Sequence, residues 1–148
     1  MDHDGYDDVY ISRILTGTRT VAVIGASANE ARPSHAIMKF LVETGFAVFA
    51  VNPRHARKEL LGRPVYARLA DIPVPIDLVD IFRRADAVSG IVAEALTLAP
   101  LPKAIWMQLG IRCDPAAVEA EAAGIEVVMG RCMKREFDRL RGESARLP

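Results

Sequence analysis

The 148-residue sequence lacks several features that would assign it to a common class of protein. Its two cysteines, Cys113 and Cys132, are too few for a disulfide framework or a zinc site built from cysteines. No apolar run approaches the ~20 residues of a membrane-spanning helix, and residues 1–10 are too acidic and polar for a signal or transit peptide. With 19 basic and 19 acidic residues the formal net charge is zero, so nothing indicates a nucleic-acid-binding or membrane-surface protein. We therefore expect a reduced, cytoplasmic protein.

Apolar segments alternate with helical patterns along the whole chain. We expect five strands, at residues 20–24, 46–51, 77–82, 103–109 and 125–129. Continuous apolar runs of this length are typical of parallel strands that helices cover on both faces. The pattern predicts an α/β fold, namely a Rossmann-like, doubly wound parallel sheet with right-handed crossovers. The expected strand order is 3-2-1-4-5, which places the reversal of order between the first and fourth strands.

The pattern favours a single domain over residues 1–148, with its core at about residues 20–140. A short leading helix is expected at residues 7–15. Residues 64–71 are interpreted as a short extended piece followed by one helical turn, and they are not counted among the strands. The C-terminal sequence GESARLP has the composition of a frayed end.

Residues 20–45 have the pattern of a phosphate-binding strand, turn and helix. A buried strand leads into the small-residue turn at residues 25–27, and an amphipathic helix begins near Pro33. The N-terminus of such a helix offers unpaired N–H groups and a partial positive charge to a phosphate. The dinucleotide fingerprint G-x-G-x-x-G is nevertheless absent, because Ser27 and Glu30 occupy the positions of its second and third glycines.

The residues that follow the expected strands carry backbone donors, hydroxyl and amide groups, and arginines, but few catalytic groups. They are Gly25-Ala26-Ser27, Asn52-Pro53-Arg54, Phe82-Arg83-Arg84, Gln108-Leu109-Gly110 and Gly130-Arg131-Cys132. Ligands of doubly wound sheets bind beyond these carboxyl ends of the strands. The set therefore suits the phosphates of a nucleotide.

The end of the second strand argues against NAD. A site for NAD uses an acidic residue there to bind the ribose hydroxyl groups, whereas this chain has Asn52, Pro53 and Arg54. A basic residue at this point fits a ribose that carries its own phosphate. Both NADP and coenzyme A (CoA) have such a ribose.

Five segments carry a more specific resemblance: VIGAS…RPS, VNPRH…LLGRPVYARLADIP, VDIFRR, IWMQLGI and VVMGRCMKREFDRL. In these segments the chain resembles the small stand-alone CoA-binding proteins, which are similar to the N-terminal Rossmann domain of the succinyl-CoA synthetase α-subunit. The match runs from about Thr20 to Leu140 in the order and spacing of the family. It implies a single CoA-binding fold, in a family that has no activity established in general.

The resemblance also implies cofactor-binding residues, position by position. They are Gly25, Ala26, Ser27, Arg32, Pro33, Ser34, Val51, Asn52, Pro53, Arg54, Phe82, Arg83 and Gln108. His55 stands where the synthetase has a lysine, so the contact with the 3′-phosphate is expected from Arg54, Arg57 or Lys58. For Ser27, Asn52 and Gln108, a purely structural role in a turn or at a strand end is the alternative.

Cys132 follows the fifth expected strand and opens the last expected helix, beside Arg131 and Lys134. Such surroundings favour a reactive thiolate, which gives the hypothesis of redox pairing with the CoA thiol. The alternative, which general experience with free cysteines favours, is a small buried residue. Trp106 is expected to pack in the core rather than to bind.

Two classes of function remain. The first, which we favour, is a non-catalytic protein that binds CoA or acyl-CoA and acts as a carrier, sensor or partner subunit. The second is an NADP-linked oxidoreductase module, or a CoA-dependent enzyme subunit that acts with a partner. The sequence has no metal-ligand cluster and no constellation for nucleophilic catalysis, so we expect no enzyme activity of its own. A homo-oligomer or a protein partner is compatible with either class.

Overall fold

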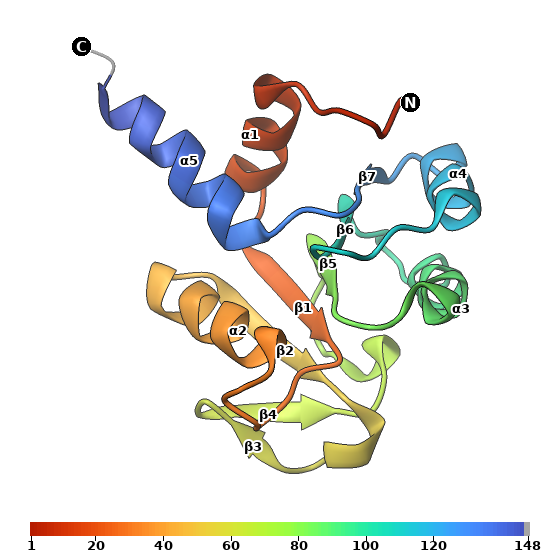
Figure 1. The fold of residues 1–148 in the computed structure, drawn as a ribbon. Helices are drawn as coiled ribbons and strands as arrows, with labels where there is room; N and C mark the ends of the chain where they lie inside the picture. Colours follow the sequence, from red (N-terminus) through yellow and green to blue (C-terminus); the bar gives the residue numbers. More distant parts are fainter. Residues whose placement is uncertain (147–148) are drawn as a thin grey trace.

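The computed structural model describes residues 1–146 and consists of a sheet with helices on both faces (Figure 1). The helices are α1 (Asp8–Thr16), α2 (Pro33–Thr44), α3 (Ala85–Ala95), α4 (Asp114–Ala122) and α5 (Met133–Arg146). The strands are β1 (Thr20–Ile24), β2 (Ala47–Val51), β3 (Glu59–Leu60), β4 (Arg63–Tyr66), β5 (Leu78–Ile81), β6 (Ala104–Met107) and β7 (Glu126–Val128). Two short 3₁₀ turns are η1 (Pro53–His55) and η2 (Leu69–Asp71). None of the described helices has the length and apolar character that crossing a membrane requires.

The sheet confirms the α/β, Rossmann-like fold but corrects the expected number and order of strands. Seven strands lie in the order β3-β4-β2-β1-β5-β6-β7. All neighbours are parallel except β3 and β4, which form a short antiparallel edge. The third strand expected from the sequence is β5, and it pairs with β1 instead of lying outside β2. The expected order 3-2-1-4-5 is therefore wrong.

The strand that lies outside β2 is β4, which with η2 matches the extended piece and helical turn expected at residues 64–71 but was not counted among the strands. It pairs with β2 through only two registered positions, Ala50 with Val65 and Val51 with Tyr66. Within β4 only Val65 is buried, and Pro64 interrupts any apolar run. Counted with β4, the parallel strands have the order 3-2-1-4-5-6, which is common in dinucleotide-binding folds. The reversal of order lies between β1 and β5.

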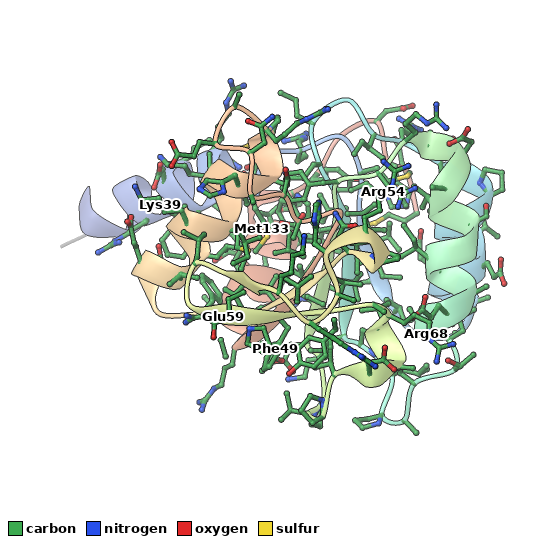
Figure 2. All side chains as sticks on the ribbon, turned by 90° about the horizontal axis from the view of Figure 1, so that it is seen from below. Lys39, Phe49, Arg54, Glu59, Arg68 and Met133 are labelled. Carbon is green, nitrogen blue, oxygen red and sulfur yellow. The ribbon has the colours of Figure 1, made fainter. Side chains whose placement is uncertain are left out.

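Alternate residues of the strands face two separate cores. In β1, Val21 and Val23 pack in the core beneath α1, α2 and α5, whereas Ala22 and Ile24 pack in the core with α3 and α4. Figure 2 shows Met133 among the side chains that fill the first of these layers, and Met133 is buried. Burial on both faces explains why the central strands read as continuous apolar runs.

A helix lies near each end of the described part of the chain. The leading helix is confirmed as α1, and the carboxylate of its N-cap Asp7 accepts a hydrogen bond from the Val9 N–H at 2.9 Å. The C-terminal helix α5 continues past Leu140 to Arg146, so most of the segment that was expected to fray is helical. Residues 147–148 lie outside the described part of the chain.

Two tyrosines near the N-terminus close the outer edge of β7. The Tyr10 hydroxyl donates to the Val127 carbonyl oxygen at 2.7 Å and accepts from the Val127 N–H at 3.0 Å. The Tyr6 hydroxyl accepts from the Met129 N–H at 2.8 Å. An unpaired strand edge invites pairing with another chain, and these hydroxyl groups satisfy part of that edge. They also hold the start of the loop that joins β7 to α5.

Asp80 is a fully buried carboxylic acid in the middle of β5. It lies in register between Val23 and Trp106, and neither carboxyl oxygen has a hydrogen-bond partner in the described residues. Burial raises the pKa of Asp80 well above its ordinary value, because an isolated charge in an apolar layer is strongly disfavoured. The neutral form of the acid is therefore favoured in the folded protein.

Because of the raised pKa of Asp80, the free energy of unfolding of the native protein should fall as the pH rises. We expect Asp80→Asn to abolish this part of the pH dependence. Above about pH 4 the unfolded chain releases the Asp80 proton, whereas the folded protein retains it up to the raised pKa. Native stability should therefore fall across this window, by at most about 1.4 kcal/mol per pH unit for one group. Urea unfolding between about pH 5 and pH 8 should show the variant gaining on the native protein as pH increases. The exposed control Asp86→Asn should run parallel to the native protein; a parallel Asp80→Asn profile would contradict the assignment.

Candidate functional site

A cleft of about 1310 Å³ opens at the carboxyl ends of the central strands, where the strand order reverses. Its walls come from the segments that follow β1, β2, β5, β6 and β7, together with the first turns of α2 and α5. Sites for drug-sized ligands enclose roughly 300–1,000 Å³. The cleft therefore has room for a longer ligand.

At the floor of the cleft, the turn after β1 places the backbone of Gly25 against the backbone of Phe82. Gly25 has φ of +85°, and its N–H donates to the Val51 carbonyl oxygen at 3.0 Å. A Cβ atom on Gly25 would lie 2.8 Å from the Phe82 carbonyl oxygen. Both the positive φ and this close approach require glycine. The packing of β1 against β5 therefore requires glycine at position 25.

The loop between this turn and α2 is ordered by its own polar side chains. The Ser27 hydroxyl oxygen accepts from the Asn29 N–H at 3.1 Å, and the Asn29 carboxamide oxygen accepts from the Ala31 N–H at 3.0 Å. Helix α2 then begins at Pro33, after the N-cap Arg32, without a side-chain cap. The open N-terminus of α2 faces the cleft and offers the partial positive charge of a helix start.

Asn52 ties the turn after β1 to the turn after β2. Its side-chain nitrogen donates to the Ala26 carbonyl oxygen at 2.8 Å, and its side-chain oxygen accepts from the Arg54 N–H at 3.0 Å. Its own N–H donates to the Tyr66 carbonyl oxygen at 2.9 Å. Asn52 therefore positions η1, which carries Arg54 at the rim of the cleft.

The structure brings together all but two of the residues expected at the site. The residues that line the cleft are Gly25, Ser27, Arg32, Pro33, Ser34, Asn52, Pro53, Arg54, Phe82, Arg83 and Gln108. Ala26 and Val51 do not line it, because their side chains are buried in the two cores. Both contribute carbonyl oxygens that hold neighbouring turns together.

Sequence reasoning left several lining residues out of the expected site. They are Ala36, Ile37, His55, Arg84, Leu109, Ile111, Cys132 and Arg135. Arg84, Leu109 and Cys132 were named among the residues that follow the expected strands, but the resemblance did not include them in the cofactor-binding set. The helical spacing from Pro33 to Ile37 was a second available signal. Arg135 lies in α5, and no local pattern indicates that this helix borders the cleft.

The cleft is strongly basic although the chain as a whole has no net charge. Five arginines line it (Arg32, Arg54, Arg83, Arg84 and Arg135), and no aspartate or glutamate does. Only Arg84 has a carboxylate within ion-pair distance among the described residues, at 3.6 Å from Asp86. Guanidinium groups without carboxylate partners are well suited to phosphate. Residues 1–146 contain no group of three or more side chains that could hold a metal ion.

At the other end of the cleft, buried side chains hold the loop that leads into α5. The Trp106 indole N–H donates to the Arg131 carbonyl oxygen at 2.8 Å, and Trp106 is fully buried, which confirms its packing role. The Gln108 side-chain oxygen accepts from the Met133 N–H at 3.4 Å. Cys132 lies between these two anchored positions and is half-buried in the cleft wall.

Comparisons with known proteins agree with this architecture. The family described as CoA binding domain matches residues 19–138. The uncharacterized protein YneT of Bacillus subtilis (strain 168) is 34% identical over 125 residues, which cover 84% of this chain and 89% of YneT. The solved structure of a hypothetical protein from Pyrococcus horikoshii OT3 superposes with a TM-score of 0.88 at 36% identity, covering 96% of this chain and 97% of that one.

A second kind of relative is much longer than this chain. The ADP-forming acetate–CoA ligase I of Archaeoglobus fulgidus is 34% identical over 123 residues. These residues cover 78% of this chain but only 18% of the ligase. The similarity therefore concerns one part of that protein.

We expect Gly25→Ala to destabilise the fold by roughly 2–4 kcal/mol, because it combines a left-handed backbone with a collision. Gly45→Ala is a matched control: Gly45 has φ of +104°, but a Cβ there would meet nothing within 4 Å. This control should lose only about 1–2 kcal/mol. Urea unfolding of the two variants measures the difference. Equal losses would show that the contact with Phe82 does not determine the residue at position 25.

Proposed function

Because the chain belongs to the CoA binding domain family, we propose that it binds coenzyme A or an acyl-CoA in this cleft and catalyses no reaction on its own. The observation that carries the proposal is the cleft of five arginines and no carboxylates at the reversal of strand order. CoA carries a pyrophosphate and a 3′-phosphate, so it presents several negative charges to such a surface. Hydrogen bonds between these phosphates and guanidinium groups are charge-assisted, and such bonds are stronger than those between neutral groups.

The arrangement of the turns suggests how the phosphates divide between them. The pyrophosphate fits the turn at residues 25–27 and the open start of α2, where the backbone can be approached closely. The 3′-phosphate of the adenosine fits η1, whose Arg54 and His55 line the cleft. Arg57 and Lys58, the other expected contacts, do not line it. Arg54 is therefore the contact that we propose for the 3′-phosphate.

The proposal that the chain catalyses no reaction on its own is supported by the chemistry of the lining residues. Apart from arginines, the titratable side chains of the cleft are His55 and Cys132. General acid–base catalysis commonly uses a carboxylate or a histidine positioned by a third group. The described residues give His55 no side-chain hydrogen bond that would orient it.

A second candidate is a CoA-dependent enzyme subunit that works with a partner. It is favoured by the similarity to the ADP-forming acetate–CoA ligase, in which the matching part is one segment of a longer protein. An NADP-linked module is the third candidate, since its 2′-phosphate would also suit Arg54. Ligand preference separates the NADP-linked module from the proposed function.

Calorimetric titration under reducing conditions with CoA, acetyl-CoA, dephospho-CoA and NADPH tests the proposal. Heat is the better signal because Trp106 is buried outside the cleft and would respond weakly in fluorescence. We expect CoA to bind, dephospho-CoA to bind more weakly, and NADPH to bind weakest. Tighter binding of NADPH than of CoA would support the NADP-linked module and overturn the proposal.

Arg54→Glu should weaken CoA binding by roughly ten- to a hundredfold, the range for losing a hydrogen bond to a charged group. Arg19→Glu is the matched control, because Arg19 is exposed at the opposite end of β1 and makes the same change of charge. Its effect on affinity should be less than about twofold at physiological salt, where distant surface charges are screened. Equal effects of both variants would remove Arg54 from the site. Arg54→Glu should weaken the binding of dephospho-CoA clearly less than it weakens the binding of CoA.

A further inference from the structure

Cys132 is held at one end of the cleft by contacts on both sides of it in the chain. The carbonyl group before it, on Arg131, accepts from the buried Trp106, and the N–H after it, on Met133, donates to Gln108. The Cys132 carbonyl oxygen accepts from the Glu136 N–H at 3.0 Å and so joins the first turn of α5. The thiol thus lies in a fixed part of the cleft wall rather than on a loose loop.

Gln108 offers a hydrogen-bond donor to a ligand next to this cysteine. Its side chain lines the cleft although only 5% of the residue is exposed. The side-chain oxygen is bonded to Met133, but no acceptor among the described side chains and backbone groups bonds to the side-chain nitrogen. This nitrogen is not among the fully buried unpaired atoms of the described residues, so it is open to the cleft and keeps its donors for a ligand. A carbonyl group of a ligand in the cleft would satisfy it.

The dimensions of the sheet fit the pantetheine arm of CoA between the phosphate turn and Cys132. Three inter-strand steps separate β1 from β7 through β5 and β6, or roughly 14 Å at the usual strand spacing. The arm from its phosphate oxygen to its sulfur has about as many backbone bonds as four peptide units, and it spans roughly 13–14 Å when extended. Its two amide carbonyls would pass Gln108, after β6, before the thiol reaches the end of β7.

We propose that Cys132 is a thiol–disulfide exchange site for CoA, an inference that rests on the proposed CoA binding. The Cys132 thiolate attacks one sulfur of a CoA disulfide, and a bond forms between Sγ and the sulfur of the CoA in the cleft. The disulfide bond of the reagent breaks, and the second CoA leaves as a thiolate that takes up a proton. Cys132 is oxidised and the departing CoA is reduced, so no other oxidant is needed. The product is a protein–CoA mixed disulfide that an added thiol reverses.

Intact-protein mass spectrometry after incubation with CoA disulfide, without reductant, tests this inference. We expect one adduct with the mass of CoA, lost on treatment with dithiothreitol. Cys132→Ser should carry no adduct, whereas the matched control Cys113→Ser should carry it, because Cys113 does not line this cleft. An unmodified native protein, or an adduct that survives Cys132→Ser, would overturn the proposal.

A kinetic comparison separates a directed reaction from general thiol reactivity. Cys113→Ser should react with CoA disulfide at least tenfold faster than with bis(2-hydroxyethyl) disulfide, which has no phosphates. Arg54→Glu in this background should slow only the reaction with CoA disulfide. Equal rates for both reagents would overturn a cleft-directed exchange.

Titration with reduced CoA distinguishes failure of this inference from failure of the proposed function. If CoA binds to the native protein but CoA disulfide leaves no adduct, the exchange site is wrong and the binding function stands. If reduced CoA does not bind and CoA disulfide leaves no adduct, the proposed function itself is wrong.

Discussion

The cleft depends on the close approach of β1 and β5 at Gly25. From this point the chain leaves β1 toward α2 on one face of the sheet and leaves β5 toward α3 on the other (Figure 1). The two connections diverge at position 25, which has no room for a Cβ atom beside the Phe82 carbonyl oxygen and the Arg83 side chain. Everything that lines the cleft is arranged around this opening: the open start of α2, η1 beyond Asn52, and the loop before α5.

The distribution of charge gives the opening its chemistry. Elsewhere in the chain several arginines and lysines are paired with carboxylates: Arg139 with Glu136 and Asp8, Arg131 with Glu136, and Lys103 with Asp77. Burial disfavours the charge on Glu136, but hydrogen bonds from Arg139 and Arg131 outweigh it and lower its pKa. No carboxylate lines the cleft, so four of its five arginines have no ion pair among the described residues and keep their donors for a ligand. The zero net charge of the chain therefore did not indicate the positive electrostatic potential in the cleft.

The sequence predicted the central strands, the class of fold and most of the cleft, because these depend on local patterns. Buried strands produce apolar runs, and in a parallel sheet the residues after each strand must meet at one edge. The position of β4 could not be predicted, since two registered pairs and one buried Val65 leave no pattern. Because β4 was not counted as a strand, the expected order assigned its position outside β2 to β5. Arg135 was missed for a related reason: only the packing of α5 across the sheet brings it to the cleft.

Asp80 extends the same electrostatic argument beneath the cleft. It lies two residues before Phe82 on the same face of β5, or about 7 Å below the cleft wall. An ionised carboxylate at that depth would repel the phosphates that the arginines attract, and through a medium of low dielectric constant the repulsion would be strong. Full burial without a partner raises its pKa and so favours the neutral acid. The cleft lining has no carboxylate, and burial favours the neutral form of Asp80 below it, so both features disfavour negative charge beside a bound phosphate. Cys132 supplies a thiol in the same cleft, and thiol–disulfide exchange is the chemistry that we propose there for a bound thiol ligand.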